Sequence, residues 1–312
     1  MTFSAKTKAE LCKIPIDDGA CALAELGGMI LFSNTVSYRE LRLTTENGNV
    51  ANRASRLLRA LFGFDFDRKV IPGTKLKKYS FVIDNKEKLD RVFEALGLNP
   101  GKALFLRLNG ALVEEDETRA AFVRGAFLTG GTVLEPDTGY HLELVTSRFT
   151  LSREAVALLL ELELPARLAV RKSNNIIYFK ESTLIEELLT RIGAPLSAMA
   201  IMEAKMWREL RNTVNRKVNC ETANLEKTAT AAAIQLDAIN KIAENRGLDT
   251  LPRGLRIAAE ARISHPEATL SELADIIGGG ITKSGLNHRF RKILCLAGEL
   301  SNGKKDGALR YD

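Results

Sequence analysis

The pattern of apolar and polar residues in the first two hundred positions predicts the same series of elements twice. Apolar residues at every third or fourth position indicate helices, and strict alternation indicates strands. The first copy is predicted to have helices at 19–28, 49–63 and 86–97 and strands at 30–35, 38–45, 66–71 and 77–84. The second copy is predicted to have helices at 117–130, 150–163 and 182–193 and strands at 131–135, 140–146, 166–172 and 174–180.

Matching residues in the two copies support a duplication. Gly27 corresponds to Gly130 at a separation of 103, and Tyr38 corresponds to Tyr140 at a separation of 102. A duplicated α-β-β-α-β-β-α unit implies two sheets related by a pseudo-twofold axis, with the first helix of each half at their contact. The first two hundred residues are therefore predicted to form an α+β domain.

Small residues on the two first helices would let the helix backbones approach closely. Gly125 lies inside its helix, where glycine costs about 0.5 to 1 kcal/mol relative to alanine, so a close helix contact would compensate for it. The alternative for the glycine pair at 130–131 is a simple helix C-cap. The small residues concerned are Ala20, Ala22, Ala24, Gly27, Ala121, Gly125, Ala126 and Gly130.

The last third of the chain has the pattern of an all-α helix-turn-helix. Three short helical stretches, 252–264, 269–278 and 282–294, carry the expected start and stop residues. Pro252 suits a helix start, Thr269 and Glu272 have capping-box spacing, and Gly278 suits a helix end, while Ala274 permits a tight helix crossing. The predicted shared core consists of Leu273, Ile276, Ile277, Ile281, Leu286, Phe290 and Ile293.

The last of these helices is predicted to expose a polar and cationic face that suits the major groove of DNA. Asn287 suits adenine and Arg289 suits guanine, whereas Lys283 and Lys292 suit phosphates. The alternative is a three-helix interaction module with a basic face. The candidate DNA-binding residues in this stretch are Thr282, Lys283, Ser284, Asn287, His288, Arg289, Arg291 and Lys292.

A helical connector is predicted over residues 203–250. Its asparagine-rich and basic stretch 211–224 suits a position near phosphates, so Asn215 and Arg216 are added to the candidate DNA-binding residues; a capped loop is the alternative. Leu236, Ile239 and Ile242 form an apolar stripe that favours core packing.

Charge and cysteine usage narrow the class of protein. The formal net charge is +6, and residues 53–78 hold eight Lys or Arg against two Asp, which favours a polyanionic partner; a solvated surface is the alternative. The four cysteines are scattered singly, which indicates neither a disulfide framework nor a zinc site. With no predicted membrane span or signal peptide, the expectation is a cytoplasmic protein without a cofactor.

Both halves resemble the LAGLIDADG homing endonuclease fold, over residues 16–195. In that family each paired helix ends in an acidic residue that binds the metal for DNA cleavage, and alignment on the glycines puts Gly27 and Gly130 at those positions. Glycine offers no oxygen ligand, and Glu25, about 200° around the helix from Gly27, is expected on the helix surface. The resemblance therefore implies no catalytic residue and no metal; an active nuclease with displaced ligands is the alternative.

The two halves and the helix-turn-helix together resemble the WhiA family, in the stretches AFVRGAFLTGG, NRKVNCETANLEKT and SGLNHRFRKI. The C-terminal part is similar to region 4 of sigma factors. The resemblance implies a sequence-specific transcription regulator on double-stranded promoter DNA, linked to sporulation and cell division and associated with the nucleoid. RNA polymerase or another regulatory protein is a further expected partner. The expected domains are 1–105, 106–202, 203–250 and 251–300, with a disordered tail at 301–312.

Overall fold

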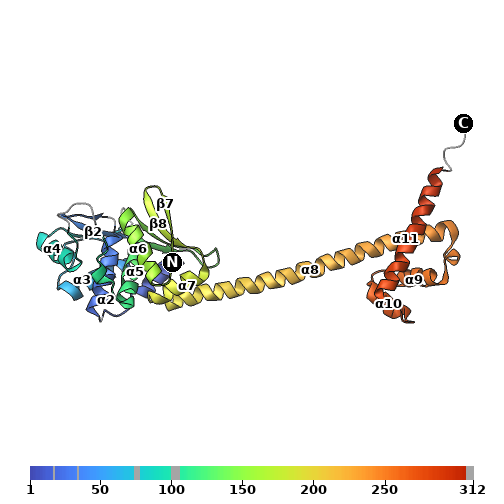
Figure 1. Cartoon of the computed structure of the whole chain (residues 1–312), viewed down its shortest axis with the longest axis horizontal. Coiled ribbons are helices and arrows are strands. Elements are labelled where there is room, and N and C mark those ends of the chain that lie inside the picture. The colour runs from blue at the N-terminus through green and yellow to red at the C-terminus, as the bar shows by residue number, and fades with distance from the viewer. Residues whose placement is uncertain (17, 34, 74–77, 100–105, 307–312) are drawn as a thin grey trace, which may run out of the picture. The chain divides into compact units, whose positions relative to one another are not determined.

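The computed structural model describes residues 1–306 except 17, 34, 74–77 and 100–105 (Figure 1). The chain forms two compact units, Met1–Glu209 and Leu210–Asp312. The first unit holds the predicted duplication. Its apolar core runs through both halves, whereas the second unit has a separate core of its own.

The first half of unit 1 contains a four-stranded antiparallel sheet in the order β1-β2-β4-β3. Leu41 lies opposite Ile83 in the β2–β4 pairing, so Leu41, Leu43, Phe81 and Ile83 point into the core. The elements are α1 (Phe3–Leu11), α2 (Gly19–Leu31), β1 (Thr35–Val36), β2 (Leu41–Thr45), α3 (Gly48–Phe62), β3 (Arg68–Val70), β4 (Tyr79–Ile83) and α4 (Lys86–Ala95).

The second half repeats this order in a sheet β5-β6-β8-β7. Leu142 lies opposite Phe179, the position that Leu41 and Ile83 occupy in the first sheet. The duplicated α-β-β-α-β-β-α order is thus confirmed. The elements are α5 (Asp116–Gly130), β5 (Gly131–Val133), β6 (Leu142–Thr146), α6 (Phe149–Glu161), β7 (Arg167–Arg171), β8 (Asn174–Phe179) and α7 (Ser182–Arg191).

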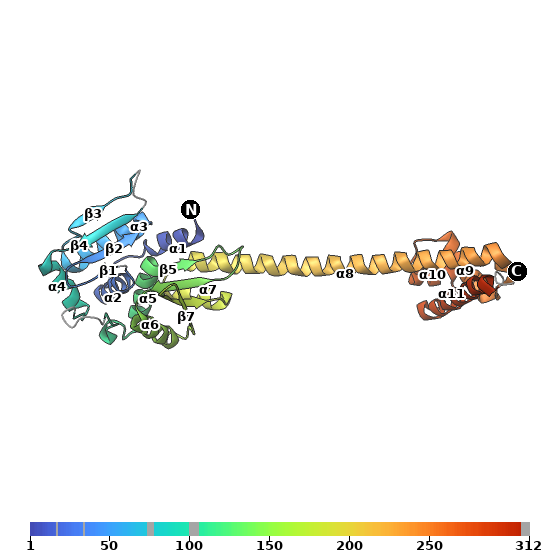
Figure 2. The same cartoon turned by 90° about the horizontal axis from the view of Figure 1, so that it is seen from above.

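The helices α2 and α5 pack side by side at the junction of the two halves (Figures 1 and 2). A Cβ on Gly28 would lie 2.1 Å from the carbonyl oxygen of Phe122, and a Cβ on Gly125 would lie 1.9 Å from that of Glu25. Each glycine therefore admits the other helix backbone, and the prediction that a close contact compensates for Gly125 is confirmed.

The packing corrects the register that the sequence suggested. Gly28 pairs with Gly125 across the contact, a separation of 97 rather than 103, so the symmetry partner of Gly130 is Ser33 and not Gly27. A Cβ on Gly27 would instead meet the side chains of Leu96 and Leu112. The separation is still 97 between β1 and β5 and grows to 101 between β2 and β6, because the hairpin loop 134–141 is four residues longer than the loop 37–40. The alignment of Gly27 with Gly130, which rested on the glycine pairs alone, is therefore wrong.

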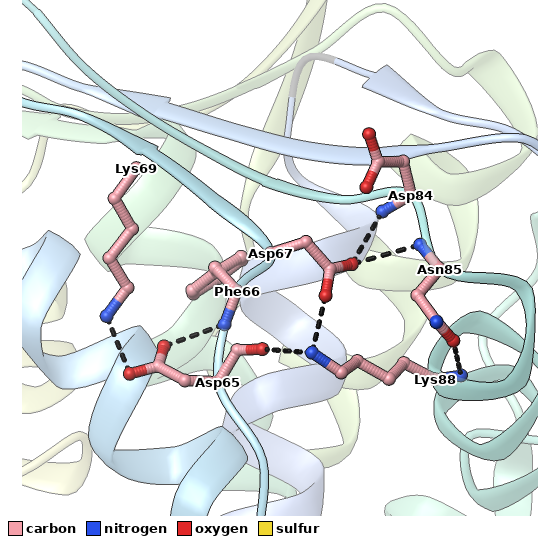
Figure 3. Close-up of polar contacts among 7 residues, drawn as sticks. All are labelled: Asp65, Phe66, Asp67, Lys69, Asp84, Asn85 and Lys88. Carbon is pink, nitrogen blue, oxygen red and sulfur yellow. Dashed lines mark hydrogen bonds and ion pairs between the residues drawn. The ribbon is translucent and has the colours of Figure 1, made fainter.

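A network of ion pairs ties β3 and β4 to α4 at the edge of the first sheet (Figure 3). The carboxylate of Asp67 accepts hydrogen bonds from the backbone N–H groups of Asp84 and Asn85, at 3.0 and 2.9 Å, and pairs with Lys88. Asn85 in turn caps α4, accepting from the N–H of Lys88 at 3.1 Å. Burial raises the pKa of Asp67, but these bonds outweigh it and hold the pKa below its ordinary value.

The remaining elements are helical. They are α8 (Pro195–Arg246), α9 (Arg253–Ser264), α10 (Leu270–Ile277), α11 (Lys283–Asp306), and two 3₁₀ turns at Gly110–Leu112 and Leu248–Thr250. The asparagine-rich stretch 211–224 lies inside α8, so the capped-loop alternative is wrong. The helix α11 continues into the expected tail as far as Asp306, and 307–312 lie outside the described residues.

Candidate nucleic-acid interface

Local sequence chemistry fixes where α10 ends and α11 begins. Thr269 and Glu272 form the predicted capping box, with the N–H of Thr269 donating to Glu272 Oε2 at 2.7 Å. Gly278 ends α10 with a φ of 65°, and the two glycines after it are also left-handed, at 67° and 75°. Only glycine adopts three successive positive φ angles without strain, so this turn sets the direction in which α11 begins. Thr282 caps α11 by accepting from the N–H of Gly285 at 3.1 Å.

One face of α11 packs on α9 and α10, which leaves the opposite face open. Leu286, Phe290, Ile293 and Ala297 are buried. At 100° per residue the opposite face carries Ser284, His288, Arg291 and Cys295, all exposed; we call these four residues the outward face. Lys292 is exposed beside it, and Asn287 is half-buried at its edge. Lys283 is also exposed, but it lies in the first turn of α11 about 100° around the helix from Ser284. Among the described residues no ion pair is found for Lys283, Arg291 or Lys292.

Two predicted positions in this unit differ from expectation. Arg289 donates from Nη1 to the carbonyl oxygen of Gly254 at 3.2 Å, which ties it to the first turn of α9 and makes it a poorer candidate for a guanine contact. Ile276 was predicted to lie in the core but is 52% exposed. Asn215 and Arg216 lie on α8 in the stretch 211–227, which is exposed throughout.

A buried arginine holds the helix-turn-helix together, and the sequence reading missed it. Arg262 is 1% exposed. Its Nε donates to Gln235 Oε1 at 3.0 Å, its Nη1 donates to the carbonyl of Ala268 at 2.5 Å, and its guanidinium lies 5.5 Å from the ring centre of Phe290. Burial lowers its pKa. The helical spacing of Leu255, Ala258, Ala259 and Arg262 puts the arginine on the buried face and could have identified it.

The C-terminal ends of the paired helices α2 and α5 are filled by protein. A Cβ on Gly130 would lie 2.7 Å from the carbonyl oxygen of Val145 and 3.1 Å from the ring of Phe32, so a carboxylate does not fit. Its symmetry partner Ser33 donates from its hydroxyl to the carbonyl of Ile30 at 2.7 Å. The described residues include no cluster of His, Cys, Asp or Glu suited to a metal ion.

A protein cation lies at the C-terminal end of α2. Arg148 donates from Nη1 to the carbonyl oxygens of Leu31 and Ser33, at 2.5 and 3.2 Å. A cation is favoured there because the C-terminal end of a helix is the negative end of its dipole. Burial lowers the pKa of Arg148. The guanidinium would also repel a divalent metal ion at this end of α2.

Glu25 was predicted to lie on the helix surface, and this prediction is wrong. The side chain is fully buried and accepts from Nε and Nη2 of Arg53, both at 2.8 Å, and from Nε of Arg124 at 2.8 Å. We call these three residues the buried triad. Arg124 comes from the second half, and it also donates to the carbonyl of Ile192 at 3.2 Å. The buried triad therefore joins the two halves, and a lone negative charge on α2 needed such partners to be buried.

Three family models match successive parts of the chain. They are described as the WhiA N-terminal LAGLIDADG-like domain (residues 19–98), the WhiA LAGLIDADG-like domain (119–211) and the WhiA C-terminal HTH domain (214–297). A relative named probable cell division protein WhiA, from Desulforamulus reducens, is 37% identical over the whole of both chains. The chain belongs to the WhiA family.

Other WhiA proteins are also similar to this chain in sequence or in structure. The protein of the same name from Desulfitobacterium hafniense is 37% identical and covers 98% of both chains. The crystal structure of full-length DUF199/WhiA from Thermatoga maritima covers 96% of this chain and 99% of its own, at 24% identity and a TM-score of 0.61. The N-terminal LAGLIDADG domain of DUF199/WhiA covers 62% of this chain and 90% of its own, at 19% identity and a TM-score of 0.51. These two structures support the fold alone.

Within the described part of the chain, no helix has the length and apolar character that crossing a membrane requires.

Proposed function

We propose that this WhiA family member is a sequence-specific regulator of transcription that binds double-stranded DNA through the outward face of α11. The observation that carries the proposal is the chemistry of that face. The first sixteen residues of α11 contain no Asp or Glu, and Lys283, Arg291 and Lys292 are exposed cations. Such a surface suits phosphates at its edges and base edges at its centre.

The roles divide according to position on the helix. Arg291 and His288 lie on the outward face and suit base edges, with Ser284 one turn earlier. Asn287, at the edge of the face, suits adenine. Lys283 and Lys292 suit the phosphates on either side of the groove.

We propose further that the N-terminal unit does not cleave DNA. Phosphodiester hydrolysis assisted by a metal needs oxygen ligands of negative charge at the paired helix ends. Gly130 has no room for one, Ser33 donates to its own helix, and Arg148 places a positive charge there. An active nuclease would have to bind its metal elsewhere.

The DNA-binding proposal is tested by gel shifts on selected promoter fragments with single variants of the full chain. Arg291→Ala is expected to weaken specific binding by about 1 to 3 kcal/mol, roughly 5- to 150-fold, and to relax sequence preference. Lys241→Ala on α8 removes the same charge from an exposed pair with Asp237 and serves as the control. Equal affinity and preference for Arg291→Ala and the control would rule out the outward face as the reader.

A second candidate function for the N-terminal unit is binding a protein, such as RNA polymerase or another regulator. Glu143 lies opposite Tyr178 and Val145 lies opposite Ile176, which puts four half-buried side chains on the outer face of the second sheet. Arg167 lies opposite Tyr178 and Lys180 lies over its ring, so this face has apolar side chains bordered by charges of both signs. An apolar centre with a polar rim is typical of protein interfaces. Val145→Glu should then abolish co-purification of the partner without altering gel shifts. The link to sporulation and cell division, and a place in the cytoplasm at the nucleoid, belong to the same proposal.

A further inference from the structure

A cavity of about 820 Å³ opens in unit 1 between α1, the start of α3 and the end of α5. Its lining is polar. The lining includes Asn47, Asn49, Asn52, Thr129 and Thr132, together with Lys8. Its volume is within the range of small-molecule sites, about 300 to 1,000 Å³.

The internal symmetry explains why this space is open. Asn47 and Arg148 occupy equivalent places: each precedes the helix after the second strand, and each donates its backbone N–H to a threonine hydroxyl, Thr45 at 3.1 Å and Thr146 at 3.2 Å. In the second half the long side chain of Arg148 reaches the end of α2. In the first half the short side chain of Asn47 caps its own helix, accepting from the N–H of Asn49 at 3.0 Å, and the space over the end of α5 stays unfilled.

Lys8 gives the cavity a positive charge that the protein does not neutralise. Its ammonium lies 5.8 Å from the ring centre of Phe127, and among the described residues no carboxylate pairs with it. Burial lowers the pKa of Lys8 to about 8. The other lysine on the wall, Lys78, is paired with Glu46 at 3.3 Å, so those two charges cancel.

We propose that this cavity binds a phosphorylated small molecule of about nucleotide size. A phosphate would supply the desolvated ammonium of Lys8 with the anion that it lacks, and charge-assisted bonds of this kind are among the stronger polar contacts. The asparagine and threonine side chains would bond the remaining polar groups of the ligand. This ligand site is separate from the proposed function, because DNA binding through α11 does not require any part of the duplex to enter the cavity.

The proposal is tested by isothermal titration of the full chain with two probes, inorganic phosphate and AMP. Lys8→Met is expected to weaken binding of both by at least about tenfold, whereas Lys6→Met, which removes an exposed lysine of the same helix, should leave it unchanged. A second variant tests the symmetry argument. Asn47→Arg supplies the long side chain that fills the equivalent space in the other half, and it should abolish binding of AMP.

The pH dependence gives an independent readout. The titratable or charged groups near Lys8 are Cys12 on its own helix and, on the cavity wall, the amino group of Met1 together with Glu46, Lys78 and Tyr79. Because Lys8 loses its charge above pH about 8, AMP binding should weaken as the pH rises from 7.5 to 9.5. Lys8→Arg should bind with little dependence on pH over that range, since arginine stays charged.

Three results would overturn the proposal. The first is no saturable binding of either probe, and the second is binding that Lys8→Met and Asn47→Arg both leave intact. The third is a Lys8→Met variant with normal AMP binding and weakened duplex binding, which would assign Lys8 to a DNA phosphate. Gel shifts with the same variants separate this test from the proposed function, because loss of AMP binding with normal DNA binding supports the cavity alone.

Discussion

The buried triad allows a quantitative prediction for Glu25→Gln. Glu25 is fully buried and receives three hydrogen bonds of 2.8 Å from two guanidiniums, whose side chains are 1% and 12% exposed. Glutamine keeps the shape but leaves two cations without a counter-charge. Removing one partner of a buried ion pair costs about 3 to 5 kcal/mol. Because glutamine still accepts one hydrogen bond, we expect the lower end, about 3 kcal/mol.

Differential scanning calorimetry of the full chain measures this effect on unit 1. For a unit of this size each kcal/mol moves the midpoint by roughly 2 to 4 °C, so Glu25→Gln should lower it by about 6 to 12 °C. Glu40→Gln is the matched control, since Glu40 pairs with Arg42 at 3.1 Å but is part-exposed, and such pairs contribute at most about 1 kcal/mol. A Glu25→Gln midpoint no lower than that of Glu40→Gln would refute the reasoning that the triad joins the halves.

Two further predictions concern the same unit. Gly125→Ala should lower the free energy of unfolding by about 3 kcal/mol or more although alanine has the better helix propensity, because the added Cβ would lie 1.9 Å from the carbonyl oxygen of Glu25. Gly19→Ala is the control, since the space around Gly19 is open, and it should not lower stability. Calorimetry of both variants measures the difference. The pKa of Asp67 is held below its ordinary value, so its contribution to stability is present above its unfolded pKa, about 3.9, and is lost as the pH falls through the lower folded pKa. Acid unfolding of Asp67→Asn should therefore depend less steeply on pH than that of the native chain; an unchanged acid profile would contradict the role of its bonds to Lys88 and two backbone amides.

The sequence pattern predicted the elements well because their burial is periodic. Seven of the eight predicted strands are present, and Thr269 and Glu272 cap α10 as expected. The strand predicted at 30–35 is wrong, because the apolar run there continues α2 to Leu31 and β1 comprises only Thr35–Val36. The N-terminal helix α1 was not predicted. Its apolar residues Phe3 and Leu11 are buried, but their spacing is too sparse to indicate a helix face.

The sequence could not give the contacts that depend on residues far apart in the chain. Glu25 is buried only because Arg53 and Arg124 lie beside it in space, 28 and 99 residues away. The glycine register failed because the contact between α2 and α5 that defines it also joins residues far apart in the chain. Arg289 has the chemistry of a base reader in the sequence, and only the fold shows that it contacts Gly254.

The most direct test of the account is selection of random DNA duplexes by the full chain in the presence of Mg²⁺, with the recovered duplexes both sequenced and sized. The account predicts one enriched sequence, recovered at full length, and loss of that enrichment with Arg291→Ala but not with Lys241→Ala. Recovery of cleaved duplexes, or an enriched sequence that Arg291→Ala leaves unchanged, would contradict it.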